Sequence, residues 1–308
     1  MMDTALRYLH EAAIAGTMRA AGDKIGVAVS SISRQIAQLE AEYGTPFIER
    51  GRREIRLTEA GKLALAYYRD SVAEREAFQN RLRDLLGVRT GRVSLAVGEG
   101  FLDRTFTDLI SDFRRRNPLV EITVTSASTT EIVRRIADDD AHLGLVFQAA
   151  ADPKIRIRLS VPQPLVVLAA PHHRLATRGS LMLHELVEED LCLGPSDFRI
   201  RQLLHEVEAR QHFTLEPSLV SNSIFVMREA VRSGDFLTIL PRNAAWSELC
   251  AGTIKAIPLD DKDIAETRVD LIHRTGRQLE GAPTRFLPML EAELRKWAQP
   301  LPGEGSAT

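Results

Sequence analysis

The stretch GTMRAAGDKIGVAVSSISRQIAQLEAEY, residues 16–43, contains two short helical patterns that meet at Gly26. The first covers residues 18–25, and Thr17 stands at its N-cap position. Because Gly26 has no Cβ, it can take the positive φ that a tight turn between helices requires. The second is marked by an apolar stripe of helical period, formed by Ile32, Ile36, Leu39 and Tyr43. The spacing predicts a helix-turn-helix, with an ordinary αα-hairpin in a helical core as the alternative.

The face opposite this stripe carries hydroxyl, amide and guanidinium groups. Such groups hydrogen-bond to base edges and phosphates in a major groove, and Arg is the commonest reader of guanine. We therefore predict that this face contacts double-stranded DNA and that Arg34 confers sequence preference. Ala28 is a poor N-cap, so Ser30 is expected to cap the helix one turn later. The residues of this face expected to bind DNA are Ser30, Ser31, Ser33, Arg34 and Gln38.

A short basic run follows the helix pair, between residues 46–48 and Thr58. Glu49 and Glu54 offset its charge only in part. A β-hairpin wing with cationic side chains at this place would lie along the phosphate backbone. Taken alone, a run of this kind usually belongs to a solvated surface. The residues expected to contact phosphates are Arg50, Arg52, Arg53 and Arg56.

Five short motifs occur in order along this part of the chain: ALRYL (5–9), AGT-x-x-AA (15–21), SRQI-x-QLE (33–40), YG-x-PF (43–47) and ER-x-x-R-x-x-R-LTEAG (49–61). Together they resemble the winged helix-turn-helix of LysR-type transcriptional regulators. The resemblance implies a sequence-specific DNA-binding regulator whose second domain binds a small-molecule effector and thereby changes the DNA-bound geometry. Where family members often have Ser followed by Gln, Pro or Ala, this chain has Ala28 and Val29, which leaves the first base contact open.

The composition is that of a globular chain with about two domains, since 308 residues contain 44% hydrophobic and 27% charged side chains. The net charge of −2 gives no global attraction to nucleic acid, so DNA binding has to come from locally placed Arg side chains. Two cysteines are too few for a disulfide framework, and no secretory signal pattern is present. We expect a protein of the reduced cytoplasm, without membrane insertion.

A long helix is predicted for residues 58–86, opened by Thr58 as N-cap and Glu59 in its first turn. In the family this linker helix pairs with that of a second subunit, so the resemblance implies a homodimer or homotetramer. Packing of the helix on its own domain is the alternative, and Arg75 interrupts the apolar stripe. The stripe consists of Ala64, Tyr68, Val72, Phe78, Leu82 and Leu85.

Residues 87–91 read as a hinge with two glycines, and from residue 93 strand and helix patterns alternate. Alternation of this kind predicts parallel α/β layers. Strands are expected at 93–97, 120–125, 143–147, 155–161, 165–170, 191–193, 236–240 and 268–273. Helices are expected at 101–116, 129–138, 198–211, 224–232 and 283–297.

This order resembles the effector-binding half of the same family, a two-lobed α/β fold like that of periplasmic binding proteins. The chain is expected to cross between the lobes near residues 161–163 and 264–267. The predicted domains are a winged helix-turn-helix (1–58), a linker helix and hinge (59–91), an effector domain (92–300) with lobe I (92–161 and 268–298) and lobe II (162–267), and a disordered tail (301–308).

Effector contacts are expected in the loops at the carboxyl ends of the strands, because ligands of open α/β sheets bind there, close to helix N-termini. The family pocket lies between the lobes and uses the corresponding loops. Simple helix capping is the alternative role for Ser128, Thr129 and Asn222. The candidate effector residues are Gly98, Glu99, Gly100, Phe101, Ser128, Thr129, Ser196, Arg199, Asn222, Ser223 and Pro241.

Glu99 departs from the family pattern, since it follows Gly98 where many members place Ser or Thr. A carboxylate in the cleft argues against a small organic anion unless Arg199 or another cation balances its charge. It could instead select a cationic or hydrogen-bond-donating effector. The alternative is a loop side chain that points to solvent.

An enzyme with a DNA-binding head and an architectural DNA-binding protein without an effector are the two competing hypotheses. Gly98-Glu99-Gly100-x-x-Asp103 imitates a dinucleotide fingerprint, but Asp103 replaces the third glycine. No hydrolase or zinc-protease motif appears, and no Cys/His cluster has zinc-like spacing. The histidines His172, His173, His205 and His212 are expected to be solvated. We therefore expect no enzyme, cofactor or metal, and a thiol switch at Cys192 or Cys250 is unsupported. RNA polymerase is a further candidate partner.

Overall fold

The structure, a computed structural model, describes residues 2–49, 54–86 and 90–298. The chain divides into two compact units, Met1–Gln79 and Asn80–Thr308. Three of the predicted features fall outside the described residues. They are the cationic side chains Arg50, Arg52 and Arg53, the hinge residues 87–89 and the tail 301–308.

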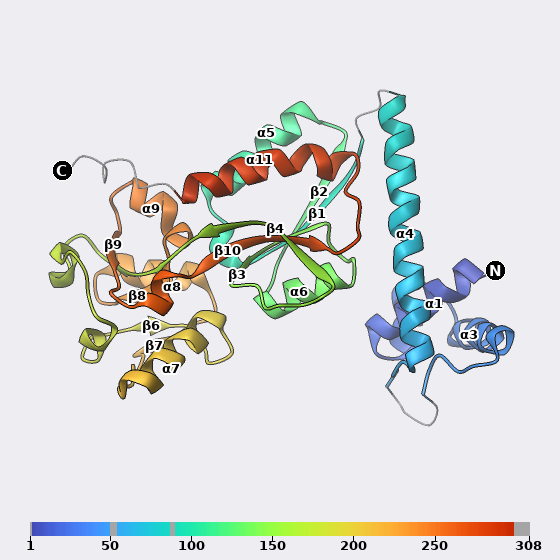
Figure 1. Cartoon of the computed structure of the whole chain (residues 1–308), viewed down its shortest axis with the longest axis horizontal. Coiled ribbons are helices and arrows are strands. Elements are labelled where there is room, and N and C mark those ends of the chain that lie inside the picture. The colour runs from blue at the N-terminus through green and yellow to red at the C-terminus, as the bar shows by residue number, and fades with distance from the viewer. Residues whose placement is uncertain (1, 50–53, 87–89, 299–308) are drawn as a thin grey trace. The chain divides into compact units, whose positions relative to one another are not determined.

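The first unit is built from helices α1 (Met2–Ala15), α2 (Met18–Ile25), α3 (Val29–Tyr43) and most of α4 (Glu59–Leu85) (Figure 1). Thr17 caps α2, because its Oγ1 accepts a 3.1 Å hydrogen bond from the backbone N–H of Ala20. Gly26 ends α2 in the left-handed region at φ 68°, which gives the turn into α3. The predicted helix-turn-helix is confirmed.

The apolar stripe of α3 forms the centre of this unit. Ile32, Ile36 and Leu39 are buried, and they pack with α1 side chains such as Leu9. The stripe ends there, since Tyr43 is 56% exposed; its ring is tilted against Phe47, and its hydroxyl donates a hydrogen bond to Met2 Sδ over 3.3 Å. Burying three branched side chains holds α3 in a fixed orientation, so the opposite face is directed outward.

The segment after α3 folds back onto the unit as the base of a wing. Ile48 and Leu57 form an antiparallel bridge, and the N–H of Glu49 donates a 2.9 Å hydrogen bond to the carbonyl of Arg56. The segment lies close to α4, where Gly61 contacts the backbone of Phe47. A Cβ at Gly61 would overlap the carbonyl oxygen of Phe47, so only glycine fits this position.

The predicted stripe of α4 splits into two groups. Ala64 and Tyr68 pack against the core of the first unit, which is the own-domain packing weighed as the alternative. Arg75 pairs with Asp3 of α1 over 2.7 Å, which explains the charge within the stripe. The other members of the stripe, Val72, Phe78, Leu82 and Leu85, are exposed, as are Leu63 and Tyr67, which the predicted stripe did not include. Periodicity identified the helix but not which of its faces meets its own domain.

The second unit begins with a five-stranded sheet of order β2-β1-β3-β10-β4. Strands β1 and β2 are parallel, as are β1 and β3, whereas β10 runs antiparallel to both β3 and β4. The strands are β1 (Gly91–Val97), β2 (Val120–Ser126), β3 (Leu143–Phe147), β4 (Ile155–Pro162) and β10 (Arg268–Arg274).

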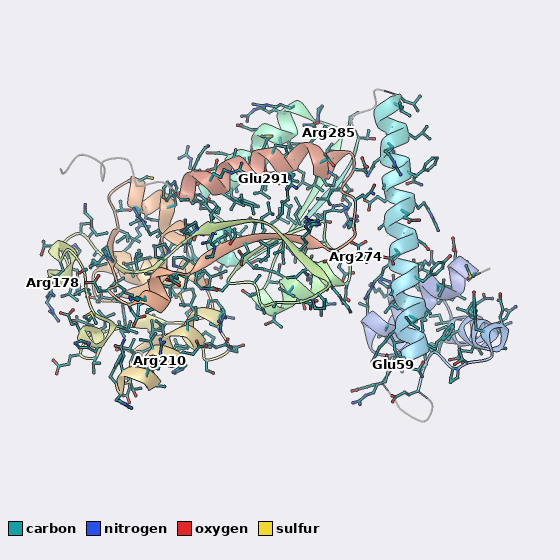
Figure 2. The ribbon with its side chains drawn as sticks, in the orientation of Figure 1. Glu59, Arg178, Arg210, Arg274, Arg285 and Glu291 are labelled. Atoms are coloured by element: carbon teal, nitrogen blue, oxygen red, sulfur yellow. The ribbon has the colours of Figure 1, made fainter. Side chains whose placement is uncertain are left out.

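Helices cover both faces of this sheet (Figure 1). On one face α5 (Arg104–Arg116) and α11 (Ala282–Trp297) pack together through an edge-to-face contact between Phe113 and Phe286. On the other, α6 (Thr129–Ala137) buries Ile132 and Ile136. Glu291 of α11, which is labelled in Figure 2, also pairs with Arg158 of β4 over 2.8 Å. The sheet and its helices thus form one compact half of the unit.

The other half contains a three-stranded antiparallel sheet of order β8-β5-β9 and a parallel pair, β6-β7. The prediction of parallel layers is therefore right for β2, β1, β3 and β6-β7 and wrong for the other strands. Strands β7 and β9 and helices α9 and α10, each at most five residues long, were not predicted. The elements are β5 (Leu165–Ala169), η2 (Arg174–Thr177), η3 (Leu183–Leu186), β6 (Cys192–Leu193), α7 (Arg199–Gln211), β7 (Leu219–Val220), α8 (Ile224–Ser233), β8 (Thr238–Pro241), η4 (Arg242–Ala245), α9 (Trp246–Cys250), β9 (Lys255–Pro258) and α10 (Lys262–Ala265).

The chain passes between the two halves after β4 and again before β10, and these two passages are hydrogen-bonded to each other. The N–H of Gln163 donates to the carbonyl of Thr267 over 2.8 Å, and Thr267 Oγ1 donates to the carbonyl of Gln163 over 2.7 Å. The Gln163 side chain donates to the carbonyl of Trp297 and accepts from the N–H of Asn243. Both passages are thereby fixed to an element of each half.

Candidate functional site

The outward face of α3 begins at Val29, with Ala28 as N-cap and no side-chain cap hydrogen bond. The prediction that Ser30 caps the helix is wrong. Ala28 already has the extended backbone of an N-cap, and its carbonyl accepts a 2.9 Å hydrogen bond from Ser31. Ser30 therefore lies inside the first turn, where its hydroxyl belongs to the outward face.

The predicted DNA-binding residues of α3 lie on that face. Ser30, Ser33, Arg34 and Gln38 are exposed, and Ser31 is half-buried. Val29 is also exposed, at 42%, although it is apolar. In the sequence Val29 stands out only as a departure from the family pattern. The signal that could have identified it as a contact residue is its place at the first position of α3. The first turn of α3 contains no acidic side chain that would repel phosphate.

Only part of the predicted wing can be placed. Arg56 is exposed beside the antiparallel bridge of the wing base. The start of the wing is hydrogen-bonded to α3. Glu40 Oε1 of α3 accepts hydrogen bonds from the backbone N–H groups of Phe47 (2.6 Å) and Ile48 (3.1 Å). A single carboxylate thus links the outward-facing helix to the start of the wing.

The predicted effector loops take several roles in the second unit. Ser128 caps α6, which is the alternative role predicted for it, and Ser223, for which capping was not predicted, caps α8. Phe101 and Pro241 are buried, and the Phe101 ring stacks on Trp297 with centroids 5.8 Å apart. Arg199 pairs with Glu206 over 3.5 Å. The remaining placements are half-buried Gly98, Gly100 and Thr129, and exposed Ser196 and Asn222.

The fold brings Glu99 and Ser223 together, although they are far apart in the sequence. Ser223 Oγ donates a 2.9 Å hydrogen bond to Glu99 Oε1, and the N–H of Phe225 donates to the same oxygen over 3.2 Å. Glu99 is thus tied to the start of α8 rather than pointing freely to solvent. Asn243, which was not predicted, donates from Nδ2 to the carbonyl of Gly100.

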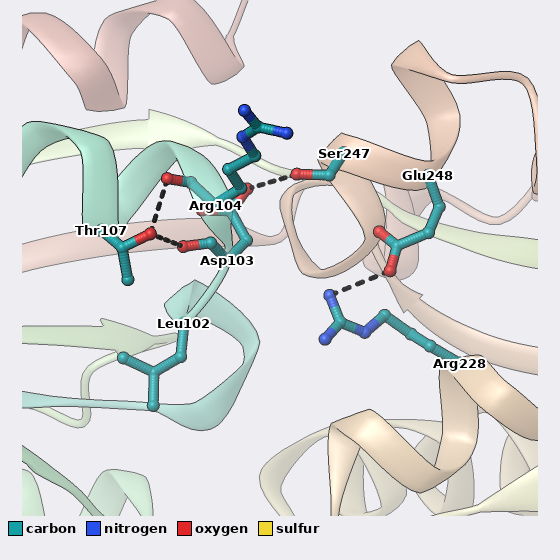
Figure 3. Close-up of a pocket in the computed structure, with 7 residues that line it drawn as sticks. All are labelled: Leu102, Asp103, Arg104, Thr107, Arg228, Ser247 and Glu248. Atoms are coloured by element: carbon teal, nitrogen blue, oxygen red, sulfur yellow. Dashed lines mark hydrogen bonds and ion pairs between the residues drawn. The ribbon is translucent and has the colours of Figure 1, made fainter.

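A pocket of about 450 Å³ opens where the start of α5 meets α8 and α9 (Figure 3). Inside it Arg228 pairs with Glu248 over 3.4 Å, and Ser247 Oγ donates to Asp103 Oδ2 over 3.3 Å. The pocket offers hydrogen-bonding groups of both charges, and none of the predicted effector residues lines it. Its lining residues are Leu102, Asp103, Arg104, Thr107, Arg228, Ser247 and Glu248.

No group of three potential metal ligands occurs in residues 2–49, 54–86 and 90–298. The prediction of solvated histidines is wrong for His173, whose ring is half-buried and caps η2, and whose pKa burial lowers. Burial raises the pKa of Cys192 and of Cys250, the latter helped by Asp103, which disfavours reactive thiolates.

Within the same described ranges, no helix has the length and apolar character needed to span a membrane.

Two family models match the chain. The one described as "Bacterial regulatory helix-turn-helix protein, lysR family" matches residues 4–62, and the one described as "LysR substrate binding domain" matches residues 87–295. The second match alone covers more than half of the chain. The chain belongs to the LysR family of transcriptional regulators, with a helix-turn-helix unit and an effector-binding domain.

Particular relatives agree with this class. The chain is 26% identical to the HTH-type transcriptional activator CmpR of Synechocystis sp. over 280 residues, which are 90% of each chain. Its fold is similar to a full-length OxyR variant from Pseudomonas aeruginosa, with a TM-score of 0.68, 19% identity and coverage of 99% and 98% of the two chains.

Two further solved structures share the fold. CbnR complexed with its target DNA matches with a TM-score of 0.53 and 21% identity, covering 97% of this chain and 100% of CbnR. The CcmR regulatory domain of Synechocystis in complex with 2-PG matches with a TM-score of 0.58 and 20% identity, covering 67% of this chain and 98% of that domain. At these identities the likeness concerns the fold.

Proposed function

We propose that α3 enters the major groove of double-stranded DNA and that the wing follows the adjacent phosphates. The observation that carries this proposal is the outward face of α3, where Ser30, Ser33 and Arg34 are exposed while the buried stripe fixes the helix. Arg34 would read a base edge, and the adjacent serines would contact bases or phosphates. Arg50, Arg52, Arg53 and Arg56 of the wing would contact phosphates. A protein that works on DNA in this way would act in the cytoplasm of a bacterial cell.

Val29 adds an apolar contact to this interface. It is the first residue of α3, and the first turn of a recognition helix is the part that reaches base edges. An exposed isopropyl group at that place suits the C5-methyl group of thymine, which apolar side chains contact in the major groove. Val29, which differs from the residues common at this position in the family, would thus favour operators with thymine at the contacted base pair.

The second unit is proposed to hold the effector. Lobe I would comprise residues 92–161 and 268–298, and lobe II residues 162–267, on either side of the hydrogen-bonded passages at Gln163 and Thr267. The second unit offers two places for a small molecule. One is the set of loops around Glu99 and Ser223, and the other is the pocket in Figure 3.

The exposed apolar side chains of α4 support a homo-oligomer. Leu63, Tyr67 and Phe78 are all more than half exposed on one helix, a costly arrangement for a lone chain. Pairing with α4 of a second copy would cover them and present two α3 helices to two half-sites. Contact with RNA polymerase stays a prediction.

The decisive experiment is fluorescence-anisotropy binding of the full chain to the DNA upstream of its own gene and to scrambled DNA, at two salt concentrations. Arg34→Ala should lose the preference for upstream DNA, at a cost of roughly 1–3 kcal/mol. The matched control is Arg115→Ala, which removes one exposed arginine from α5 of the other unit. Equal binding of wild type to both DNAs would favour an architectural protein, and no binding at low salt would overturn the DNA-binding proposal.

A further inference from the structure

The segment between β1 and α5 belongs to the half built on the five-stranded sheet, yet its polar groups reach the other half. Glu99 contacts the start of α8, the carbonyl of Gly100 accepts from Asn243 Nδ2 over 3.3 Å, and Asp103 accepts from Ser247. These contacts join positions more than 120 residues apart. The two halves are therefore bridged by side chains of the protein itself at this place.

Glu99 makes the bridge at a position suited to an anion. α8 is a ten-residue helix whose first N–H groups have no partner within the helix, and the helix dipole favours negative charge there. Ser223 serves as N-cap by accepting from the N–H of Val226 over 3.4 Å. Its own hydroxyl proton and the N–H of Phe225 then both point to Glu99 Oε1. The carboxylate completes the cap from outside the helix.

Arg199, the cation that the sequence suggested as a partner for Glu99, does not balance its charge. Arg199 pairs instead with Glu206 over 3.5 Å, on its own helix α7. Among the described residues, the donors to Glu99 are the hydroxyl of Ser223 and the amide of Phe225. The start of α8 is therefore the group that compensates the carboxylate.

We propose that Glu99 is a resident anion: it fills the anion position at the start of α8, holds the two halves together without a bound ligand, and excludes small carboxylates from that position. This inference rests on the proposed effector role of the second unit. A carboxylate ligand entering beside α8 has to displace Glu99, because two negative charges at one helix start repel each other. The site as folded therefore favours ligands that offer hydrogen-bond donors or positive charge to Glu99.

Removing the carboxylate should create a vacancy that acetate fills. Thermal unfolding of the full chain is measured in sodium acetate and in sodium chloride at equal ionic strength and pH. Glu99→Ala should lower Tm by on the order of 2–6 °C in chloride. Acetate should restore part of that loss in a saturable way, while wild type should unfold at the same temperature in both salts.

Two further variants make the result decisive. Glu99→Gln places a neutral acceptor in the same space, so it should fold, unfold at a temperature between those of wild type and Glu99→Ala, and show no acetate effect. Glu229→Ala removes another carboxylate of α8, one paired with Arg232 away from the helix start, and should also show no acetate effect.

Several outcomes would overturn the proposal: a Glu99→Ala variant that ignores acetate, a wild type that acetate stabilises equally, or a Glu99→Gln variant as stable as wild type. The assay contains neither DNA nor effector. Failure of the DNA-binding experiment would therefore leave this result standing, and failure here would leave the DNA-binding result standing.

Discussion

Glu40 Oε1 lies 2.6 Å from the backbone nitrogen of Phe47 and accepts its hydrogen bond. Glu40 is the last residue of the SRQI-x-QLE motif, whose polar members Ser33, Arg34 and Gln38 lie on the outward face of α3. Phe47 starts the wing, and its side chain is buried in the core of the same unit. The Glu40 carboxylate therefore contributes to the orientation of the wing relative to α3, beside the buried Phe47 side chain, and its contribution can be tested by itself.

Glu40→Ala leaves the N–H groups of Phe47 and Ile48 without their acceptor, and both are partly buried. Hydrogen bonds to a charged group contribute about 1.5–3 kcal/mol, so the free energy of unfolding should fall by that order. A displaced wing should also lose a phosphate contact and reduce the salt slope of DNA binding by about 1. Urea unfolding and anisotropy titration against salt measure both. If the salt slope of Glu40→Ala equals that of wild type, Glu40 does not position the wing for its phosphate contacts.

Val29 can be tested at the level of one methyl group. Replacing a thymine of the operator by deoxyuridine removes only its C5-methyl, and burial of one such group is worth about 0.8 kcal/mol. Wild type should therefore bind one uracil-substituted operator roughly fourfold more weakly. Val29→Ala should bind the thymine and uracil forms equally. If every single substitution leaves wild-type affinity unchanged, Val29 does not contact a thymine methyl.

Glu131, in the first turn of α6, should make the free energy of unfolding depend on pH. The hydrogen bond from Arg134, assisted by Arg135, holds the pKa of Glu131 at about 2. Its folded pKa lies below the unfolded value, so the stabilisation is present above about pH 4.5 and is lost as pH falls toward 2. Glu131→Gln should be less stable than wild type at pH 7, and the difference should shrink below pH 4.5. Urea unfolding across pH 3–7 tests this, and a difference that does not change with pH would contradict it.

The parts of the fold predicted correctly are those that depend on local sequence. The stripe of Ile32, Ile36 and Leu39, the cap at Thr17 and the turn at Gly26 each follow from neighbours within a few positions. The direction of β10 does not, because its partners β3 and β4 lie more than 100 residues earlier. A strand pattern in the sequence contains no information about the strand beside which it will lie.

The candidate sites divide in the same way. Sequence rules placed Glu99 and Ser223 in loops at strand ends, but their mutual hydrogen bond spans 124 positions and appears only in the folded chain. Phe101 and Pro241 were selected by the same rule, yet both are buried. The pocket lined by Arg228 and Glu248 was missed. Leu102 and Asp103 directly follow the predicted loop 98–101, but the other lining residues lie on helices α5, α8 and α9.

The exposed apolar side chains of α4 lead to a prediction about assembly. Phe78 is 60% exposed and Leu63 is 73% exposed, while Ala64 and Tyr68 of the same helix are engaged by its own unit. The exposed apolar side chains of α4 are therefore available to pack against α4 of a second copy. A glutamate at position 78 would be buried in that interface without a partner for its charge. Phe78→Glu should shift the chain toward monomer in sedimentation velocity at micromolar concentration. It should also weaken binding to an operator with two half-sites, because the single α3 of a monomer contacts only one of them. Val187→Glu, which places the same charge at a 45% exposed position beside η3, should leave the sedimentation coefficient unchanged. If Phe78→Glu sediments as wild type does, the contact between copies lies elsewhere on the chain.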